Sequence, residues 1–498
     1  MYTLAASAVL ASVAAASSAA SVEGTAPPEV RQGAGGWPAP NSDLAGTRAA
    51  HGARIEASNV AGLRVRWRFR FRGEGGSFGL VASTPVVHHG TVYVQDTKSS
   101  VFALDAATGR LRWARLYTAP NDGPNGVAVG FGRVFAATDT TAFALNARTG
   151  RRIWSRRLAD RDEQFVDVAP VVASGRVYLS TVGFPPGGRG ALYALDARSG
   201  RIVWRFDTIR DPWRNTLAGG GGVWYPVSVD GAGRVYAGIA NPGPWGGTRK
   251  LPNGGAFPGP VPYTSSLVVL DGRTGRLLWH DQVTPHDVRD YDFQDSPVLA
   301  TVRRSGRTVR AVFGAGKAGR VVAWDRTTRS RLWTRAVGTH LRDLGPLPTR
   351  AVRVCPGLFG GVLTPMAYAG GRLFVPVVEL CMRESAVHSY SVLQRPPEDG
   401  KGVLYALDAA NGKTLWSRRL GSALFGCATV SRDVVFAPTY DGRVHAVSTR
   451  DGTLLWQGRA RAGINACPVV AGGLLLVGAG APHRDFPVPA AELIAYAV

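Results

Sequence analysis

The stretch LYALDARSGRIVW, residues 192–204, recurs along most of the chain with small changes. A short alternating strand is followed by a turn of the form D-x-x-T/S-G and by a second strand that ends in tryptophan. In such a turn the aspartate and the hydroxyl residue can bond turn amides, and the glycine takes a positive φ. The unit is therefore a β-hairpin whose indole can pack against the next unit.

Six further copies place an aspartate, or the residue equivalent to it, eight positions before the tryptophan. They are VFALDAATGRLRW (101–113), AFALNARTGRRIW (142–154), LVVLDGRTGRLLW (267–279), VVAWDRTTRSRLW (321–333), LYALDAANGKTLW (404–416) and VHAVSTRDGTLLW (444–456). The tryptophans are 40 to 83 residues apart, a spacing that fits four-stranded propeller blades joined by unequal loops.

An eighth copy is split between the two ends of the sequence. NVAGLRVRWRF (59–69) supplies only the second strand, and ELIAYAV (492–498) supplies only the first. If residues 494–498 pair with residues 64–71, the two ends close one blade and leave no sheet edge open. We therefore predict an all-β fold, one eight-bladed β-propeller over residues 60–498, closed by its N- and C-terminal strands.

The N-terminal region differs in composition from the repeats. Residues 1–21 are apolar and rich in small side chains, which predicts a signal peptide, with an uncleaved anchor as the alternative because no basic residue precedes the apolar run. Residues 22–59 are rich in Gly, Pro and Ala and predict a linker. We expect an exported protein (periplasmic, cell-surface or secreted) that is not an integral membrane protein beyond this segment.

Four cysteines in an exported chain allow two disulfides, with three possible pairings. We favour Cys355–Cys381 and Cys427–Cys467, because each would join neighbouring repeats or strands. The formal charge of +23 comes almost entirely from arginines, which are scattered rather than gathered in a run. We attribute them to solvated outer strands and expect no nucleic-acid partner.

The repeat resembles the tryptophan-docking motif of the pyrroloquinoline quinone (PQQ) family of eight-bladed propellers, over about residues 55–498. That family contains PQQ-dependent alcohol dehydrogenases and cofactor-free relatives, including the outer-membrane assembly lipoprotein. Because both groups share the blades, only the site residues can separate them.

Three segments resemble the dehydrogenase group. In GGGGVWYPVSVDGAGRVYAGIANPGPW (219–245), the matching positions are Trp224, which would stack under the quinone, and Asn241, which would bind the metal. The alternative roles are a packing tryptophan and a turn residue. In GAGKAGRVVAWDRTTRSRLW (314–333), Lys317 matches the cation that reaches the quinone oxygens; the alternative is an exposed lysine.

The third segment, TPHDVRDYDF (284–293), resembles the family pattern T-P-H-D-x-W-D-Y-D. The resemblance makes Asp290 the catalytic base and a metal ligand, and Asp292 a further ligand, for Ca²⁺ or a lanthanide ion. On an extended backbone, residues two apart point the same way, so both carboxylates could face one cation. The alternative is an acid pair bridged to Arg289 and Arg303.

The sequence also departs from the family pattern. The metal-binding glutamate is missing at about Pro185, the vicinal cysteine pair is absent, and Asn125-Gly126 replaces an arginine. Asp167 stands where a threonine is usual, and no C-x-x-C-H motif for haem occurs. We predict a divergent quinoprotein dehydrogenase that oxidises an alcohol or similar substrate by hydride transfer to PQQ beside a metal ion, with an unidentified electron acceptor. The alternative is a non-catalytic binding or assembly scaffold.

Overall fold

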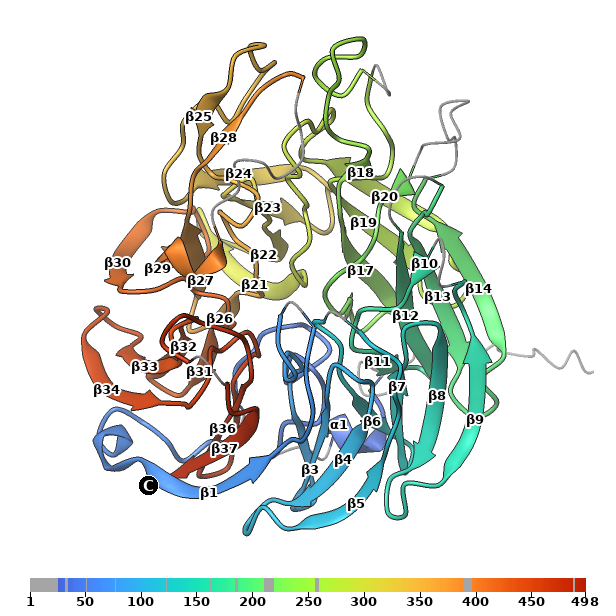
Figure 1. The fold of residues 1–498 in the computed structure, drawn as a ribbon, viewed down its shortest axis with the longest axis vertical. Coiled ribbons are helices and arrows are strands. Elements are labelled where there is room, and N and C mark those ends of the chain that lie inside the picture. Colours follow the sequence, from blue (N-terminus) through green and yellow to red (C-terminus); the bar gives the residue numbers. More distant parts are fainter. Residues whose placement is uncertain are drawn as a thin grey trace, which may run out of the picture.

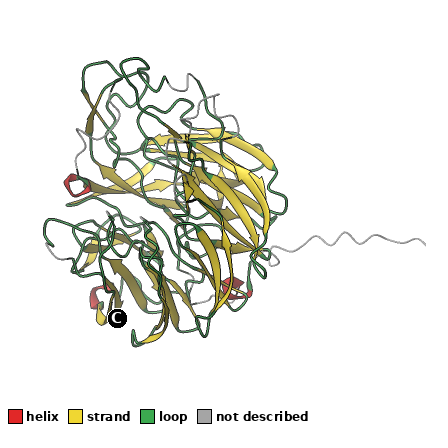
Figure 2. Ribbon diagram, turned by 45° about the vertical axis from the view of Figure 1, so that its right-hand side comes forward, coloured by secondary structure: helices red, strands yellow, loops and turns green. Residues whose placement is uncertain are grey.

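The computed structural model describes residues 26–31, 35–50, 52–76, 78–121, 123–160, 164–183, 187–209, 219–255, 259–387, 396–486 and 489–498. Eight antiparallel sheets stand side by side around one axis (Figure 1). The helical turns in the described residues are α1 (Pro28–Arg31), η2 (Val60–Gly62) and η3 (Pro397–Asp399). Figure 2 shows that the rest of the described regular structure is strand. The predicted all-β, eight-bladed fold is confirmed.

Each blade runs from an innermost to an outermost strand in chain order. The first four blades are β2 (Val86–His88), β3 (Thr91–Gln95), β4 (Val101–Asp105) and β5 (Leu111–Arg115); β6 (Ala128–Gly130), β7 (Arg133–Ala137), β8 (Thr141–Asn146) and β9 (Arg152–Arg157); β11 (Val171–Ala173), β12 (Arg176–Gly183), β13 (Ala191–Asp196) and β14 (Ile202–Asp207), with the short β10 (Gln164–Phe165) beside β12; and β16 (Ser228–Val229), β17 (Arg234–Ile239), β19 (Ser266–Asp271) and β20 (Leu277–Gln282).

The next three blades repeat this order. They are β21 (Val298–Arg304), β22 (Arg307–Gly314), β23 (Arg320–Asp325) and β24 (Arg331–Ala336); β26 (Ala367–Ala369), β27 (Arg372–Glu379), β29 (Lys401–Asp408) and β30 (Thr414–Leu420); and β31 (Thr429–Ser431), β32 (Val434–Pro438), β33 (Arg443–Ser448) and β34 (Leu454–Arg459). Two small sheets lie in loops, β15 (Gly219–Gly220) with β18 (Pro242–Gly243), and β25 (Val352–Val354) with β28 (Met382–Glu384).

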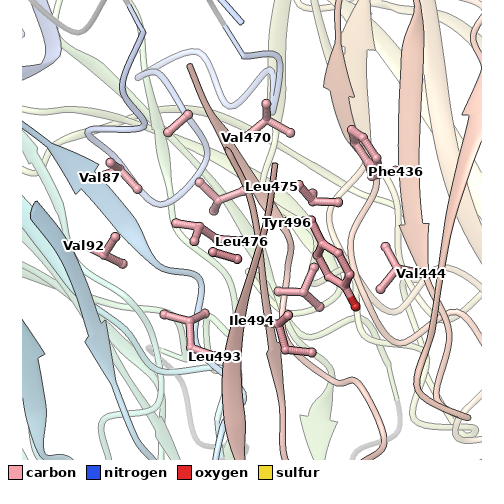
Figure 3. Close-up of a cluster of buried hydrophobic side chains, with 14 of the residues drawn as sticks. Val87, Val92, Phe436, Val444, Val470, Leu475, Leu476, Leu493, Ile494 and Tyr496 are labelled. Atoms are coloured by element: carbon pink, nitrogen blue, oxygen red, sulfur yellow. The ribbon is translucent and has the colours of Figure 1, made fainter. Parts of the chain in front are cut away.

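The eighth blade joins the two ends of the propeller. It consists of β35 (Val469–Ala471), β36 (Leu474–Ala479), β37 (Glu492–Ala497) and, outermost, β1 (Arg64–Arg70). In the antiparallel register Arg64 faces Ala497 and Arg70 faces Glu492, so the predicted closure is confirmed (Figure 1). Figure 3 shows the apolar side chains of β36 and β37 between those of the first and seventh blades, which holds the closing blade from both sides.

The repeated tryptophans dock on the turn of the next blade. The indole N–H of Trp154 donates to the Ala197 carbonyl (3.1 Å), and Asp196 accepts the backbone N–H of Ser199 (2.8 Å) within the same turn. Gly200 has φ +73°, and a Cβ there would lie 2.6 Å from the Trp154 ring. The turn therefore needs glycine for its backbone angle and for the space that the indole occupies.

One junction departs from this rule. In the motif of residues 321–333, Arg329 stands in the glycine position with φ +64°. Trp279, which precedes this turn in the ring, is the one docking tryptophan that makes no indole–carbonyl hydrogen bond within the described residues. The turn that carries Arg329 in place of glycine is thus also the turn at which the docking indole, that of Trp279, lacks its hydrogen bond to a carbonyl within the described residues.

Part of the stretch predicted as a linker packs into the centre of the ring. We call residues 37–50 the strap. Its backbone carbonyls at Leu44, Ala45 and Thr47 accept N–H groups of the innermost strands of the fourth, fifth and sixth blades, each at 2.7 to 2.8 Å. Trp37 is fully buried and pairs with Val87 of the first blade. The strap therefore runs across the hub, unlike a free linker.

Arg48 fastens the strap. Its guanidinium is fully buried and donates to the Ala428 and Pro468 carbonyls (both 2.9 Å), to Oγ1 of Thr429 (2.8 Å) and to Oδ1 of Asn41 (3.0 Å). Burial lowers the pKa of Arg48 to about 9. The residues predicted as a signal peptide lie outside the described residues.

Both favoured disulfides are present, Cys355–Cys381 and Cys427–Cys467. The second joins the loops that precede the innermost strands of the seventh and eighth blades. Exposed arginines line outermost strands, as on β9 and β1. Among the described residues, we find no helix whose length and apolar character would carry it through a bilayer.

Candidate functional site

A cavity of about 140 Å³ opens at one end of the ring axis. Most of its walls come from the residues three to five positions before the innermost strand of six different blades. These are Gly123, Pro124, Trp224, Tyr225, Gln294, Leu363, Thr364, Phe425 and Asn465. Phe78, Phe359, Asp292 and Lys317 complete the wall. Because six blades contribute equivalent positions, the cavity is central rather than lateral.

One side of the cavity is aromatic. Trp224 is half-buried, and its ring centroid lies 6.4 Å from that of Phe165. The Phe359 ring lies 6.4 Å from the rings of both Phe78 and Phe425. Such surfaces can cover a planar, conjugated ligand on its faces and keep water away from it.

On the other side of the cavity, Asp292 and Lys317 line the wall and form an ion-paired cluster with Asp290. Nζ of Lys317 lies 2.8 Å from Oδ2 of Asp290 and 2.6 Å from Oδ2 of Asp292. The three side chains are 11%, 14% and 2% exposed, so water screens these charges weakly. The structure therefore brings Asp290, Asp292 and Lys317 together, and the last two line the same cavity as Trp224.

The acidic loop is built by its first aspartate, whose role the sequence did not reveal. Oδ1 of Asp287 accepts the backbone N–H of Arg289 (2.9 Å), and Oδ2 accepts that of Tyr291 (2.6 Å). Between them Asp290 has φ +61°. The backbone is thus a tight turn at Asp290 rather than the extended segment expected, and the two carboxylates nevertheless converge on Lys317.

The alternative pairing with arginines is not observed. The guanidinium of Arg289 donates to the carbonyls of Arg342 (3.1 Å) and Gly345 (2.7 Å), away from the acid pair. Arg303 donates to the Gly306 carbonyl within an exposed hairpin. The partner of the acid pair is Lys317.

Burial shapes the protonation of the cluster. It raises the pKa of Asp290 well above the usual range, although the charge of Lys317 acts in the opposite direction. Burial also acts to lower the pKa of Lys317, but the charges of Asp290 and Asp292 outweigh it and raise that pKa. Burial raises the pKa of Asp287 to about 6. Asp290 is therefore a stronger base than an exposed aspartate.

Asn241, the third predicted metal ligand, adjoins the cluster through its backbone. Its N–H donates to Oδ1 of Asp292 (2.7 Å), while its side-chain Nδ2 is buried without a hydrogen-bond partner. The described residues contain no group of three His, Cys, Asp or Glu side chains that could hold a metal ion. Pro185, at the place of the family's glutamate, lies outside the described residues. As it stands, the cluster does not fit a metal ion.

The chemistry of the cavity lining, rather than its volume, suits a planar anion such as PQQ. Trp224 offers an aromatic face, Lys317 a cation, and Gln294 and Asn465 side-chain amides. Asp167, which stands where a threonine is usual in the family, is buried outside the cavity wall and accepts the Gly123 N–H (2.7 Å). Of these, sequence motifs had identified only Trp224 and Lys317. The repeat register could have found the rest, because each lies shortly before an innermost strand.

Comparisons with known proteins show which families the chain resembles. A family profile described as "Glucose/ethanol/alcohol dehydrogenase, beta-propeller domain" matches residues 166–337, which include Trp224, Asp290 and Lys317. A second profile, "Outer membrane protein assembly factor BamB", matches residues 18–184 and 356–484. The chain is 28% identical to the quinohemoprotein alcohol dehydrogenase ADH IIB of Pseudomonas putida, over 91% of this chain and 74% of that protein.

Solved structures share the architecture. The quinohemoprotein alcohol dehydrogenase ADHIIG from Pseudomonas putida HK5 superposes with a TM-score of 0.82 at 24% identity, covering 94% of this chain and 81% of that one. A europium-containing methanol dehydrogenase gives 0.78 at 22% identity, covering 93% and 98%. At these identities the structures show the common fold. From the profiles, the sequence relatives and the ring of eight blades, the chain belongs to the PQQ-repeat eight-bladed β-propeller family that includes the PQQ-dependent alcohol dehydrogenases.

Proposed function

We propose that the protein is a PQQ-dependent dehydrogenase that oxidises an alcohol or a similar reduced substrate. One observation carries the proposal: Asp292 and Lys317 line a cavity on the ring axis together with Trp224, and Asp290 is ion-paired to that lysine. A scaffold needs no buried base and cation in its hub, whereas alcohol oxidation requires a group that takes the hydroxyl proton.

Each residue has a distinct part in this chemistry. PQQ, when bound, supplies the acceptor for the hydride that leaves the alcohol carbon. Asp290 accepts the hydroxyl proton; its Oδ2 is held by Lys317, while its Oδ1 makes no hydrogen bond within the described residues. Lys317 orients this base and presents positive charge to the cavity. Trp224 provides the face for stacking, and the phenylalanine rings keep the site dry.

Asp290→Asn tests the proposal. The amide cannot take the proton, so we expect loss of dye-linked alcohol oxidation by about 10²-fold or more, with PQQ still bound. PQQ binding is followed by quenching of tryptophan fluorescence. Asp207→Asn, an exposed aspartate in an ion pair with Arg205 on β14, is the matched control. Retained turnover in Asp290→Asn removes that residue from the role of base.

A second candidate function is a non-catalytic scaffold for binding or assembly. The match of the assembly-factor profile to the early and late blades favours it, as do the departures from the dehydrogenase pattern. Absence of PQQ binding at micromolar cofactor would support the scaffold over the enzyme. For either function, two disulfides support export to an oxidising compartment. In the enzyme, electrons pass on to an acceptor that is still unidentified.

A further inference from the structure

The acid pair Asp290 and Asp292 is already bridged by a cation of the protein itself, the ammonium group of Lys317. We propose that the ammonium group of Lys317 takes the place of a metal ion between Asp290 and Asp292, so that the pocket works without a bound metal. The proposal rests on the proposed function where it concerns PQQ, but the state of the cation site can be tested without the cofactor.

The distances leave no room for both the Lys317 ammonium and a metal ion between the two carboxylates. Nζ of Lys317 lies 2.8 Å from Oδ2 of Asp290 and 2.6 Å from Oδ2 of Asp292. A Ca²⁺ ion bound by the same oxygens would lie about 2.3–2.6 Å from each, and so would overlap the ammonium. A metal could enter only if Lys317 left, which would strand a buried cation away from its carboxylates.

With Lys317 in place, the described residues also leave too few free oxygen ligands for a metal. Ca²⁺ takes about six to eight oxygen ligands. Oδ1 of Asp292 is engaged by the Asn241 N–H (2.7 Å), and both oxygens of Asp287 are engaged by backbone N–H groups. Two acids with one lysine leave at most a single net negative charge, which does not call for a divalent ion.

The position of Lys317 is fixed by the backbone around it. Its backbone N–H donates to the Asp292 carbonyl (2.9 Å), so the two residues are joined by main chain as well as by charge. Gly316 precedes it, and a Cβ at Gly316 would collide with that same carbonyl. An ammonium has three N–H bonds. Two point to Asp290 and Asp292, and the third is available to an oxygen of a ligand in the cavity that Lys317 lines.

Terbium luminescence tests the proposal on the apo protein. Tb³⁺ bound at the acid pair would be sensitised by Trp224, which lines the same cavity. We expect no saturable emission from the wild type at micromolar Tb³⁺, and saturable emission from Lys317→Met, which frees both carboxylates. The emission should disappear again when Asp292→Asn is added to Lys317→Met.

Two results would overturn the proposal. One is saturable Tb³⁺ emission from the wild type that Asp292→Asn abolishes. The other is a folded Lys317→Met protein, verified by circular dichroism, that gains no Tb³⁺ site. If Lys317→Met does not fold, the wild type and Asp292→Asn decide the matter, since metal occupancy at the acid pair contradicts the proposal and its absence supports it.

The PQQ titration separates this inference from the proposed function. We expect the same affinity for PQQ in EDTA and in Ca²⁺, within about twofold. Binding that is about tenfold tighter with Ca²⁺ would overturn metal independence while supporting the dehydrogenase. Failure to bind PQQ in either buffer would sink the dehydrogenase, and the terbium result would still decide which cation the acid pair holds.

Discussion

Gly200→Ala should destabilise the protein more than Gly175→Ala, although both glycines lie in turns of the third blade with nearly the same backbone. Their φ angles are +73° and +68°. A Cβ at Gly200 would lie 2.6 Å from the docked Trp154 ring, whereas a Cβ at Gly175 would meet nothing within 4 Å. The pair therefore separates backbone strain from the space needed by the indole.

The magnitudes follow from these two terms. Alanine in the left-handed region costs about 1–2 kcal/mol, and this cost applies to both variants. Overpacking against a buried side chain adds about 1–3 kcal/mol, and this cost applies only to Gly200→Ala. We expect free energies of unfolding lower by about 1–2 kcal/mol for Gly175→Ala and by about 2–5 kcal/mol for Gly200→Ala.

Urea denaturation followed by tryptophan fluorescence and by circular dichroism measures both variants against the wild type. Arg329→Gly provides the reverse test, because it restores glycine to the one turn where the indole of Trp279 lacks its hydrogen bond, and it should stabilise the protein. Equal destabilisation by Gly200→Ala and Gly175→Ala would refute the claim that indole docking requires the glycine.

Three further predictions concern buried groups. Burial raises the pKa of Glu384 to about 8, so the folded state holds an extra proton between about pH 4.5 and 8. The free energy of unfolding therefore falls as pH rises through that window, by roughly 3–5 kcal/mol. Glu384→Gln should remove this fall when urea denaturation at pH 5 and at pH 9 is compared. Arg48→Met should lower the free energy of unfolding by about 3–5 kcal/mol, since it leaves the buried acceptors around the strap unpaired, and Arg48→Lys should recover only part of that loss in thermal denaturation. Loss of the Cys427–Cys467 disulfide, by reduction or in a Cys427→Ser/Cys467→Ser variant, should lower the free energy of unfolding by about 4 kcal/mol, because the bond closes a loop of 40 residues. An unchanged melting temperature would contradict this.

The blades were predictable because each carries its own local signal. In seven blades the turn and the tryptophan recur in one order, so strand pairing within those blades needs no knowledge of distant residues. The strap was not predictable, because its glycines, prolines and alanines are typical of a linker. It packs through Arg48 and Trp37, whose partners come from blades that the sequence places up to hundreds of residues away.

Sequence motifs named the residues proposed for the site, but they did not indicate how the charges of these residues pair. The motif around Asp290 and Asp292 and the single lysine at Lys317 pointed to one pocket, and the structure brings them together. Which cation meets the acids depends on the turn at Asp290 and on the loop of another strand, and Arg289 was equally close in sequence. The organising role of Asp287 comes from backbone hydrogen bonds that residue type alone does not specify.

The pairing of β1 with β37 has a consequence for synthesis. Residues 64–70 leave the ribosome, or cross the membrane of an exporting cell, more than four hundred residues ahead of their partners at 492–497. Throughout that interval β1 presents an unsatisfied edge that could recruit another chain. The arginines at alternate positions of β1 place positive charge along this strand, which disfavours its pairing with other chains before β37 has been synthesised.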